Sequence, residues 1–107
     1  MSFRVIVVPF LNVEAMALFP FILVKNKEMA ADKTLINHEL IHLKQEAELL
    51  VIPFYILYLL NYIANLFIYR NHNKAYLNIV FEREAYRNEK NYVYLKQRGL
   101  WFWRFCF

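Results

Sequence analysis

The amino-acid sequence predicts an α+β fold, in which a small antiparallel sheet with an edge strand packs against two or three helices. Residues 3–8 and 16–25 are rich in β-branched and aromatic side chains, the composition typical of strands. From residue 33 onward, apolar side chains recur at helical spacing. A chain of 107 residues has room for one domain with one modest core. Its three parts are β-rich (1–31), helical (32–98) and an aromatic tail (99–107).

The second predicted strand, residues 16–25, carries Pro20 in its middle. Because proline has no N–H to donate to a neighbouring strand, we expect this strand at a sheet edge. The free backbone groups of an edge strand allow an extended peptide to pair with it. An alternative interpretation is that Pro20 only protects the edge from aggregation. The residues expected along the edge are Leu18, Phe19, Phe21 and Ile22.

The helical part is predicted to contain three helices, over residues 33–51, 54–69 and 75–98. Pro53 separates the first two, because its ring clashes with a carbonyl of the preceding turn. The uncharged run 49–69 is about 21 residues long, enough to cross a bilayer. Its polar side chains, among them Asn61 and Asn65, favour instead a helix that packs on a small domain or lies on a membrane surface.

Composition narrows the range of partners. Hydrophobic residues make up 60% of the chain and aromatic residues 19%, so we expect a protein partner, a second copy in a homodimer, or a membrane surface to cover part of it. The formal net charge is +4, but the basic residues are dispersed, and we predict no nucleic-acid binding. The N-terminus lacks the pattern of a signal peptide, so a cytoplasmic or peripheral membrane protein is expected.

Residues 38–42 read H-E-x-x-H within the first predicted helix. Histidines four apart lie on one helix face, about 5–6 Å apart at Cβ, so His38 and His42 can share one zinc ion. Glu39 projects beside that metal, where it suits a general base better than a ligand. A chance match is the standing alternative for so short a motif.

A catalytic zinc site needs a third protein ligand. Glu82 and Glu84 in the third predicted helix are the candidates, although a solvated face with i, i+4 ion pairs would explain the same residues. Glu46, one turn beyond His42, is a candidate to orient that imidazole.

Residues 38–42 and the segment Glu82-Arg83-Glu84-Ala85 together resemble the gluzincin metallopeptidases, whose third ligand is a glutamate in an E-x-x-A pattern on a later helix. The closer likeness is to minigluzincins and to the catalytic domains of the β-lactam-sensor and prenyl-protein endopeptidase membrane families. It covers roughly residues 16–90, and Tyr86 stands where the family pattern has an aspartate.

The resemblance implies a minimal zincin-like fold and a zinc-dependent endopeptidase. His38, His42 and Glu82 would bind Zn²⁺, with Glu84 as the alternative ligand, and Glu39 would act as general base toward a zinc-activated water. Tyr86 would serve beside the ligands or as an oxyanion donor, and the substrate would be a peptide or protein.

Two other hypotheses remain open at this level. In the first, the chain is a latent or inactive zinc-binding relative whose C-terminal tail fills the cleft. In the second, it is a membrane-associated structural protein without metal. Both are compatible with the apolar composition.

Overall fold

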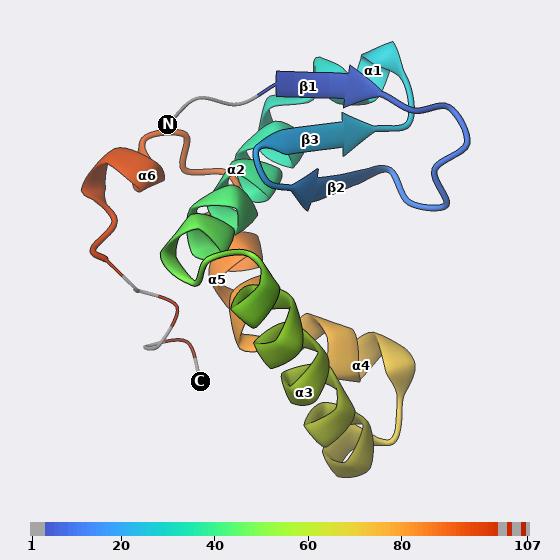
Figure 1. Cartoon of the computed structure of the whole chain (residues 1–107), viewed down its shortest axis with the longest axis vertical. Coiled ribbons are helices and arrows are strands. Elements are labelled where there is room, and N and C mark those ends of the chain that lie inside the picture. The colour runs from blue at the N-terminus through green and yellow to red at the C-terminus, as the bar shows by residue number, and fades with distance from the viewer. Residues whose placement is uncertain (1–3, 101–102, 104–105, 107) are drawn as a thin grey trace.

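The computed structural model describes residues 4–100, 103 and 106, and the predicted α+β class is confirmed (Figure 1). The strands are β1 (Arg4–Val7), β2 (Ala15–Leu18) and β3 (Phe21–Val24). The helices are α1 (Lys27–Ala30), α2 (Lys33–Glu48), α3 (Ile52–Tyr69), α4 (His72–Leu77), α5 (Val80–Asn88) and α6 (Tyr94–Gln97). The sheet lies beside α2, and α3 runs away from it with α4 alongside (Figure 1).

The sheet is mixed, which differs from the antiparallel pairing expected. Its strand order is β1-β3-β2, with β1 parallel and β2 antiparallel to β3. The loop 8–14 between β1 and β2 is long enough to carry the chain past the position of β3. β3 therefore enters between the first two strands and runs in the same direction as β1.

The predicted strand 16–25 is two strands, because Phe19 and Pro20 form the turn between β2 and β3. Proline is tolerated there since a turn position needs no ladder hydrogen bond. β2 is an edge strand, and Leu18 lies on it. The prediction is wrong for Phe21 and Ile22, which lie in the central strand β3.

Helix α2 is buried on two faces, and this fixes its position. Leu43 packs against Ile22 of the sheet, whereas Ile41, about 200° around the helix, packs against Ala85 of α5. All four side chains are buried. The side chains that α2 presents between these two contacts are therefore held in the middle of the molecule.

Helix α3 follows a tight turn and is apolar along its length. Leu50 and Val51 both have positive φ, a costly conformation for residues with side chains. Pro53 lies in the first turn of α3, where its missing N–H has no helical partner to lose. By length and composition α3 could cross a membrane, and only 11% of its residues are buried.

The single helix predicted over 75–98 is three shorter helices in the structure. Ile79 is extended, and the N–H of Val80, which opens α5, donates to the side-chain oxygen of Asn61 on α3 at 2.8 Å. This contact between distant residues starts a new helix where the sequence pattern alone continues. It also sets which side chains of α5 face α2.

The aromatic tail lies partly outside the described residues, which include Trp103 and Cys106 but not 101, 102, 104, 105 or 107. The Trp103 ring packs against Phe81 at 5.1 Å between centroids, and Cys106 is buried in the same cluster. Both tail residues therefore pack on the α3–α5 core.

Arg98 joins the end of the helical part to α2 and α5. Its guanidinium donates to both carboxylate oxygens of Glu48 at 2.7 and 2.9 Å and also to Glu84. The three side chains are almost fully buried. Burial makes each charge depend on the other two, since an unpaired charge in the interior is costly.

Replacing Arg98 with alanine should therefore lower the free energy of unfolding by about 3–5 kcal/mol, because two buried carboxylates lose their partner. Urea unfolding followed by circular dichroism measures the change. The control is Lys96→Ala, at an exposed position on α6, the short helix that ends just before Arg98, with an expected effect below about 0.5 kcal/mol. Equal effects of the two substitutions would contradict the proposed role of the ion pairs.

Candidate metal centre

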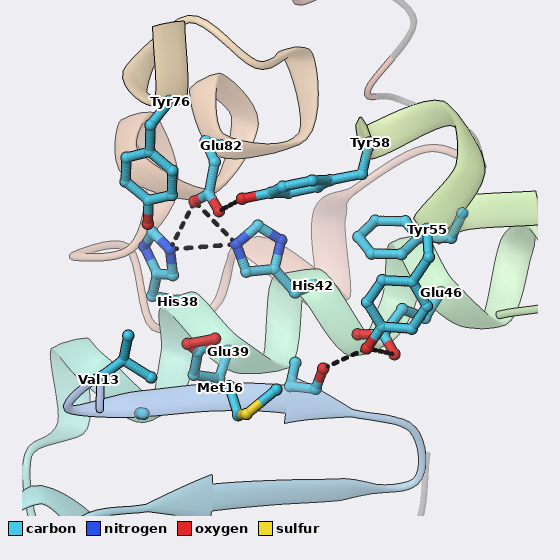
Figure 2. Close-up of a pocket in the computed structure, with 13 residues that line it drawn as sticks. Val13, Met16, His38, Glu39, His42, Glu46, Tyr55, Tyr58, Tyr76 and Glu82 are labelled. Atoms are coloured by element: carbon cyan, nitrogen blue, oxygen red, sulfur yellow. Dashed lines mark hydrogen bonds and ion pairs between the residues drawn. The ribbon is translucent and has the colours of Figure 1, made fainter. Parts of the chain in front are cut away.

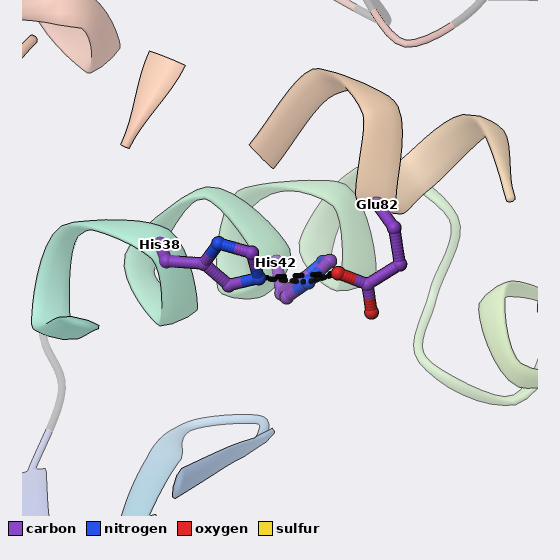
Figure 3. Close-up of side chains that lie close together, drawn as sticks. All are labelled: His38, His42 and Glu82. Atoms are coloured by element: carbon purple, nitrogen blue, oxygen red, sulfur yellow. Dashed lines mark hydrogen bonds and ion pairs between the residues drawn. The ribbon is translucent and has the colours of Figure 1, made fainter. Parts of the chain in front are cut away.

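Two histidines of α2 and one glutamate of α5 point at one another (Figure 3). The Nε2 atoms of His38 and His42 lie 3.2 Å apart, and Oε1 of Glu82 lies 3.1 and 3.0 Å from them. All three residues are buried. Ligand atoms on a tetrahedral zinc ion, with bonds of about 2.0–2.1 Å, are separated by about 3.3 Å. The group therefore has the spacing of a metal site.

Each imidazole has its second nitrogen occupied by an acceptor. Nδ1 of His38 lies 2.9 Å from a carboxylate oxygen of Glu89. Nδ1 of His42 lies 2.8 Å from Oε1 of Gln45, whose NH₂ group donates to the Phe81 carbonyl at 3.0 Å. Both Nδ1 atoms must consequently donate, so each Nε2, which carries the lone pair of the neutral imidazole, is directed toward Glu82.

The third ligand is also held in place. The Tyr58 hydroxyl of α3 donates to Oε2 of Glu82 at 2.6 Å, so that Oε1 faces the histidines (Figure 2). Three electron-pair donors thus converge in a buried space. Without a positive charge between them, such an arrangement is repulsive. The chemistry of the donor set fits a divalent cation that accepts nitrogen and oxygen ligands.

The pKa values of His42 and Glu82 also indicate that this group is stabilised by a positive charge. Burial lowers the pKa of His42, but the neighbouring Glu82 carboxylate outweighs this and raises the pKa to about 10. Burial raises the pKa of Glu82, but the charge of His42 together with the hydrogen bonds from His38, His42 and Tyr58 more than reverses this, so the pKa of Glu82 falls well below its usual range. In the metal-free protein, a proton on His42 supplies the positive charge at neutral pH.

Glu39 borders the same space without joining the ligands (Figure 2). Burial raises the pKa of its carboxyl, while the nearby imidazoles of His42 and His38 partly oppose the shift. The pocket that it borders has a volume of about 300 Å³ and is mainly apolar. Its lining comprises Val13, Ala15, Met16, Ala17, His38, Glu39, His42, Glu46, Phe54, Tyr55, Tyr58, Tyr76 and Glu82.

Glu84 and Glu46, two other predicted site residues, have different roles in the structure. Glu84, the alternative ligand, points away from the histidines and pairs with Arg98. Glu46 does not orient His42, because its Oε1 accepts from the Phe19 N–H at 3.0 Å; its Oε2 has no partner among the described residues. Glu46 thus fastens the turn after β2 to α2.

Tyr86 lies against the ring of His38, with an edge-on contact of 4.5 Å between centroids. Its hydroxyl is 3.3 Å from that of Tyr76, so it does not hydrogen-bond to the histidine. The carboxylate that supports His38 comes from Glu89, three residues later. Tyr86 therefore packs against a ligand at the position where the resembled pattern has an aspartate.

Glu89, Gln45 and Tyr58 are the contacts that the sequence analysis did not identify. The only sequence signal was that Gln45 lies three residues after His42, on the same helix face. Glu89 is placed by Asn37, whose side-chain NH₂ donates to the Glu89 carbonyl at 2.8 Å. Such contacts join residues far apart in sequence and carry no periodic pattern.

Comparisons with protein-family models, with curated proteins and with solved structures find no match to this chain. The chemistry that the site can support is therefore inferred from its geometry alone. That geometry establishes a buried group of His38, His42 and Glu82 that could hold a metal ion.

Substitution of a ligand should abolish metal binding. We expect purified wild-type protein to carry or take up about one zinc per chain, and His42→Ala and Glu82→Ala to lose it, because two donors hold zinc much more weakly than three. Elemental analysis of folded protein measures this. His72→Ala is the matched control, since this exposed histidine bonds to Tyr62 and lies outside the group. Zinc loss in the His72 variant as well would contradict the assigned ligand set.

Zinc affinity should depend on pH. Zinc must displace the proton that His42 retains while its pKa stands at about 10, so binding releases a proton. The apparent affinity should rise about tenfold per pH unit between about pH 6 and 8. Competition with a chromophoric chelator at each pH measures it. An affinity that does not change over this range would show that His42 is already neutral in the metal-free protein.

Proposed function

We propose that this protein is a zinc-dependent endopeptidase of the gluzincin type, with Zn²⁺ held by His38, His42 and Glu82. The observation that carries the proposal is the convergence of three buried ligand atoms, each oriented by its own partner. The same three residues are those that the resemblance to minigluzincins assigns as ligands. A purely structural metal site would have no need of the pocket and the additional carboxylate beside it.

Glu39 supports a hydrolytic role. When bound, zinc supplies a Lewis acid that acidifies water and polarises a carbonyl group. The Glu39 carboxylate borders the same pocket as the ligands and lies on the helix turn between the two histidines. Because burial raises its pKa, it can accept a proton and hold it for transfer to a leaving amine.

Strand β2 supports a peptide substrate. It is an edge strand, and Ala15, Met16 and Ala17 line the pocket beside Glu39. An extended peptide that pairs with β2 would run past the metal ligands and place a side chain in the apolar pocket. In the register of β2 with β3, the backbone groups of Met16 face Leu23, and those of Ala15 and Ala17 face the free edge. The Ala17 carbonyl already accepts from the Tyr55 hydroxyl at 2.8 Å, so we expect pairing chiefly at Ala15.

Replacing Glu39 with glutamine should separate catalysis from metal binding. We expect the variant to keep its zinc and to lose peptidase activity by about 10²- to 10⁴-fold, because the amide cannot accept the proton. Cleavage of a fluorogenic peptide library, read alongside zinc content, measures both.

The matched control is Glu28→Gln, at an exposed position on α1, which should retain full activity. A zinc-loaded wild-type protein that cleaves no member of a diverse library would contradict the proposed activity. Full activity of the Glu39 variant would contradict only the role of that residue.

A further inference from the structure

The polar side chains of α3 point toward the rest of the protein, where they contact α4 and α5. The side chain of Asn65 donates to the Ala75 carbonyl at 3.1 Å, and the Asn61 oxygen accepts from Val80. The Tyr62 hydroxyl and Nδ1 of His72 lie 2.7 Å apart. A helix at a boundary between protein and water has the opposite polarity, with polar groups outward. Inward polar groups are typical of helices that face hydrocarbon.

The outward side of α3 is apolar over about half of the helix circumference, at about 100° per residue. We call this side the apolar face of α3. It consists of Ile52, Ile56, Leu57, Leu59, Leu60, Ile63, Phe67 and Ile68, all exposed. Phe67 has 79% of its surface exposed and Ile52 has 71%, values unusual for such large side chains in water. No residue from 49 to 69 is charged.

We propose that the apolar face of α3 binds a lipid bilayer, with the helix lying in the plane of the membrane surface. The face offers the apolar area that an interfacial helix buries to a depth of about 5–10 Å. The charged residues that follow it, Arg70 and Lys74, are exposed and basic. Together with the net charge of +4, they favour anionic headgroups.

The path of the chain excludes a spanning orientation for α3 in this fold. The hydrogen bond between Tyr58 and Glu82 places the first half of α3 and the start of α5 at one location, the candidate metal centre. Residues 70–79 are the whole connection from the end of α3 to the start of α5. Six of them form α4, which is about 9 Å long. A segment of this length cannot recross a hydrocarbon core of about 30 Å.

A second copy of the chain fits this face less well than lipid does. The apolar side chains extend around about half of α3, and among the described residues α4 is the element that lies beside its last turns (Figure 1). A single packed helix or sheet would cover part of that arc and leave the remainder in water, whereas lipid tails surround a convex surface without a preferred direction.

Flotation with lipid vesicles tests the proposal on the full-length protein. We expect wild type to float with vesicles of phosphatidylcholine mixed with phosphatidylglycerol, and to bind phosphatidylcholine alone more weakly. The variant Leu60→Gln/Ile63→Gln/Phe67→Gln should bind about tenfold more weakly or worse, because three exposed anchors of the face become polar. Retained zinc in the same samples would show that the fold is intact.

The matched control also replaces three exposed apolar residues with glutamine, but at positions away from α3: Phe10→Gln/Val93→Gln/Leu100→Gln. It should float like wild type. Wild type that stays soluble beside vesicles without detergent would overturn the proposal. A dimer that the α3 variant dissociates, with no vesicle binding by wild type, would also overturn it in favour of a second copy.

Depth measurements distinguish a lying helix from an upright one. An environment-sensitive fluorophore on Phe67→Cys, in a Cys106→Ser background, should shift to the blue on vesicle binding, and the same label on Val93→Cys should not. The label at position 67 should be shielded from aqueous quenchers, while Lys74 should remain reactive toward an impermeant amine reagent added outside. Protection of Lys74 would indicate that the end of α3 crosses the bilayer.

Discussion

The contact between α2 and α5 holds the candidate site together, because the three residues that could bind a metal ion are divided between these two helices. Gln45 is fully buried in this contact, where its amide joins the His42 ring to the Phe81 carbonyl. The same contact directs the lone pair of His42 toward Glu82. A shift of α5 by one residue would rotate Glu82 by about 100° and remove it from the histidines. The position of one helix therefore decides whether the protein has a metal site.

Helix α3 connects this site to the outer surface of the protein. Tyr58 and Phe54 on its inner side line the pocket, whereas Ile56 and Leu57, within one turn of them, belong to the apolar face. One helix thus contributes both to the candidate site and to the surface proposed to meet lipid. If both proposals hold, the pocket opens near a membrane surface, where a peptide segment beside that membrane would encounter β2.

Most of the features that were predicted correctly from the sequence depend on local patterns. The H-E-x-x-H motif, the N-terminal strands and the helix break near Pro53 each depend on spacing or on the backbone preference of a residue close in sequence. Predictions that needed distant contacts were less successful. Phe21 and Ile22 were assigned to an edge because Pro20 was taken to lie within a strand, and the order of three strands is not a local property. The helix predicted over 75–98 is divided at Val80, whose N–H donates a hydrogen bond to the Asn61 side chain of α3.

A four-residue separation is almost one helical turn, so the spacing of His38 and His42 is enough to place them on one helix face. The choice between Glu82 and Glu84, which lie about 200° apart on α5, depends instead on how the helices pack. The face that meets α2 depends on how Ala85 and its neighbours pack, and this leaves Glu84 for Arg98. The support of His38 by Glu89 was likewise decided by packing, because a hydrogen bond between α2 and the end of α5 follows from their contact and from no spacing in the chain.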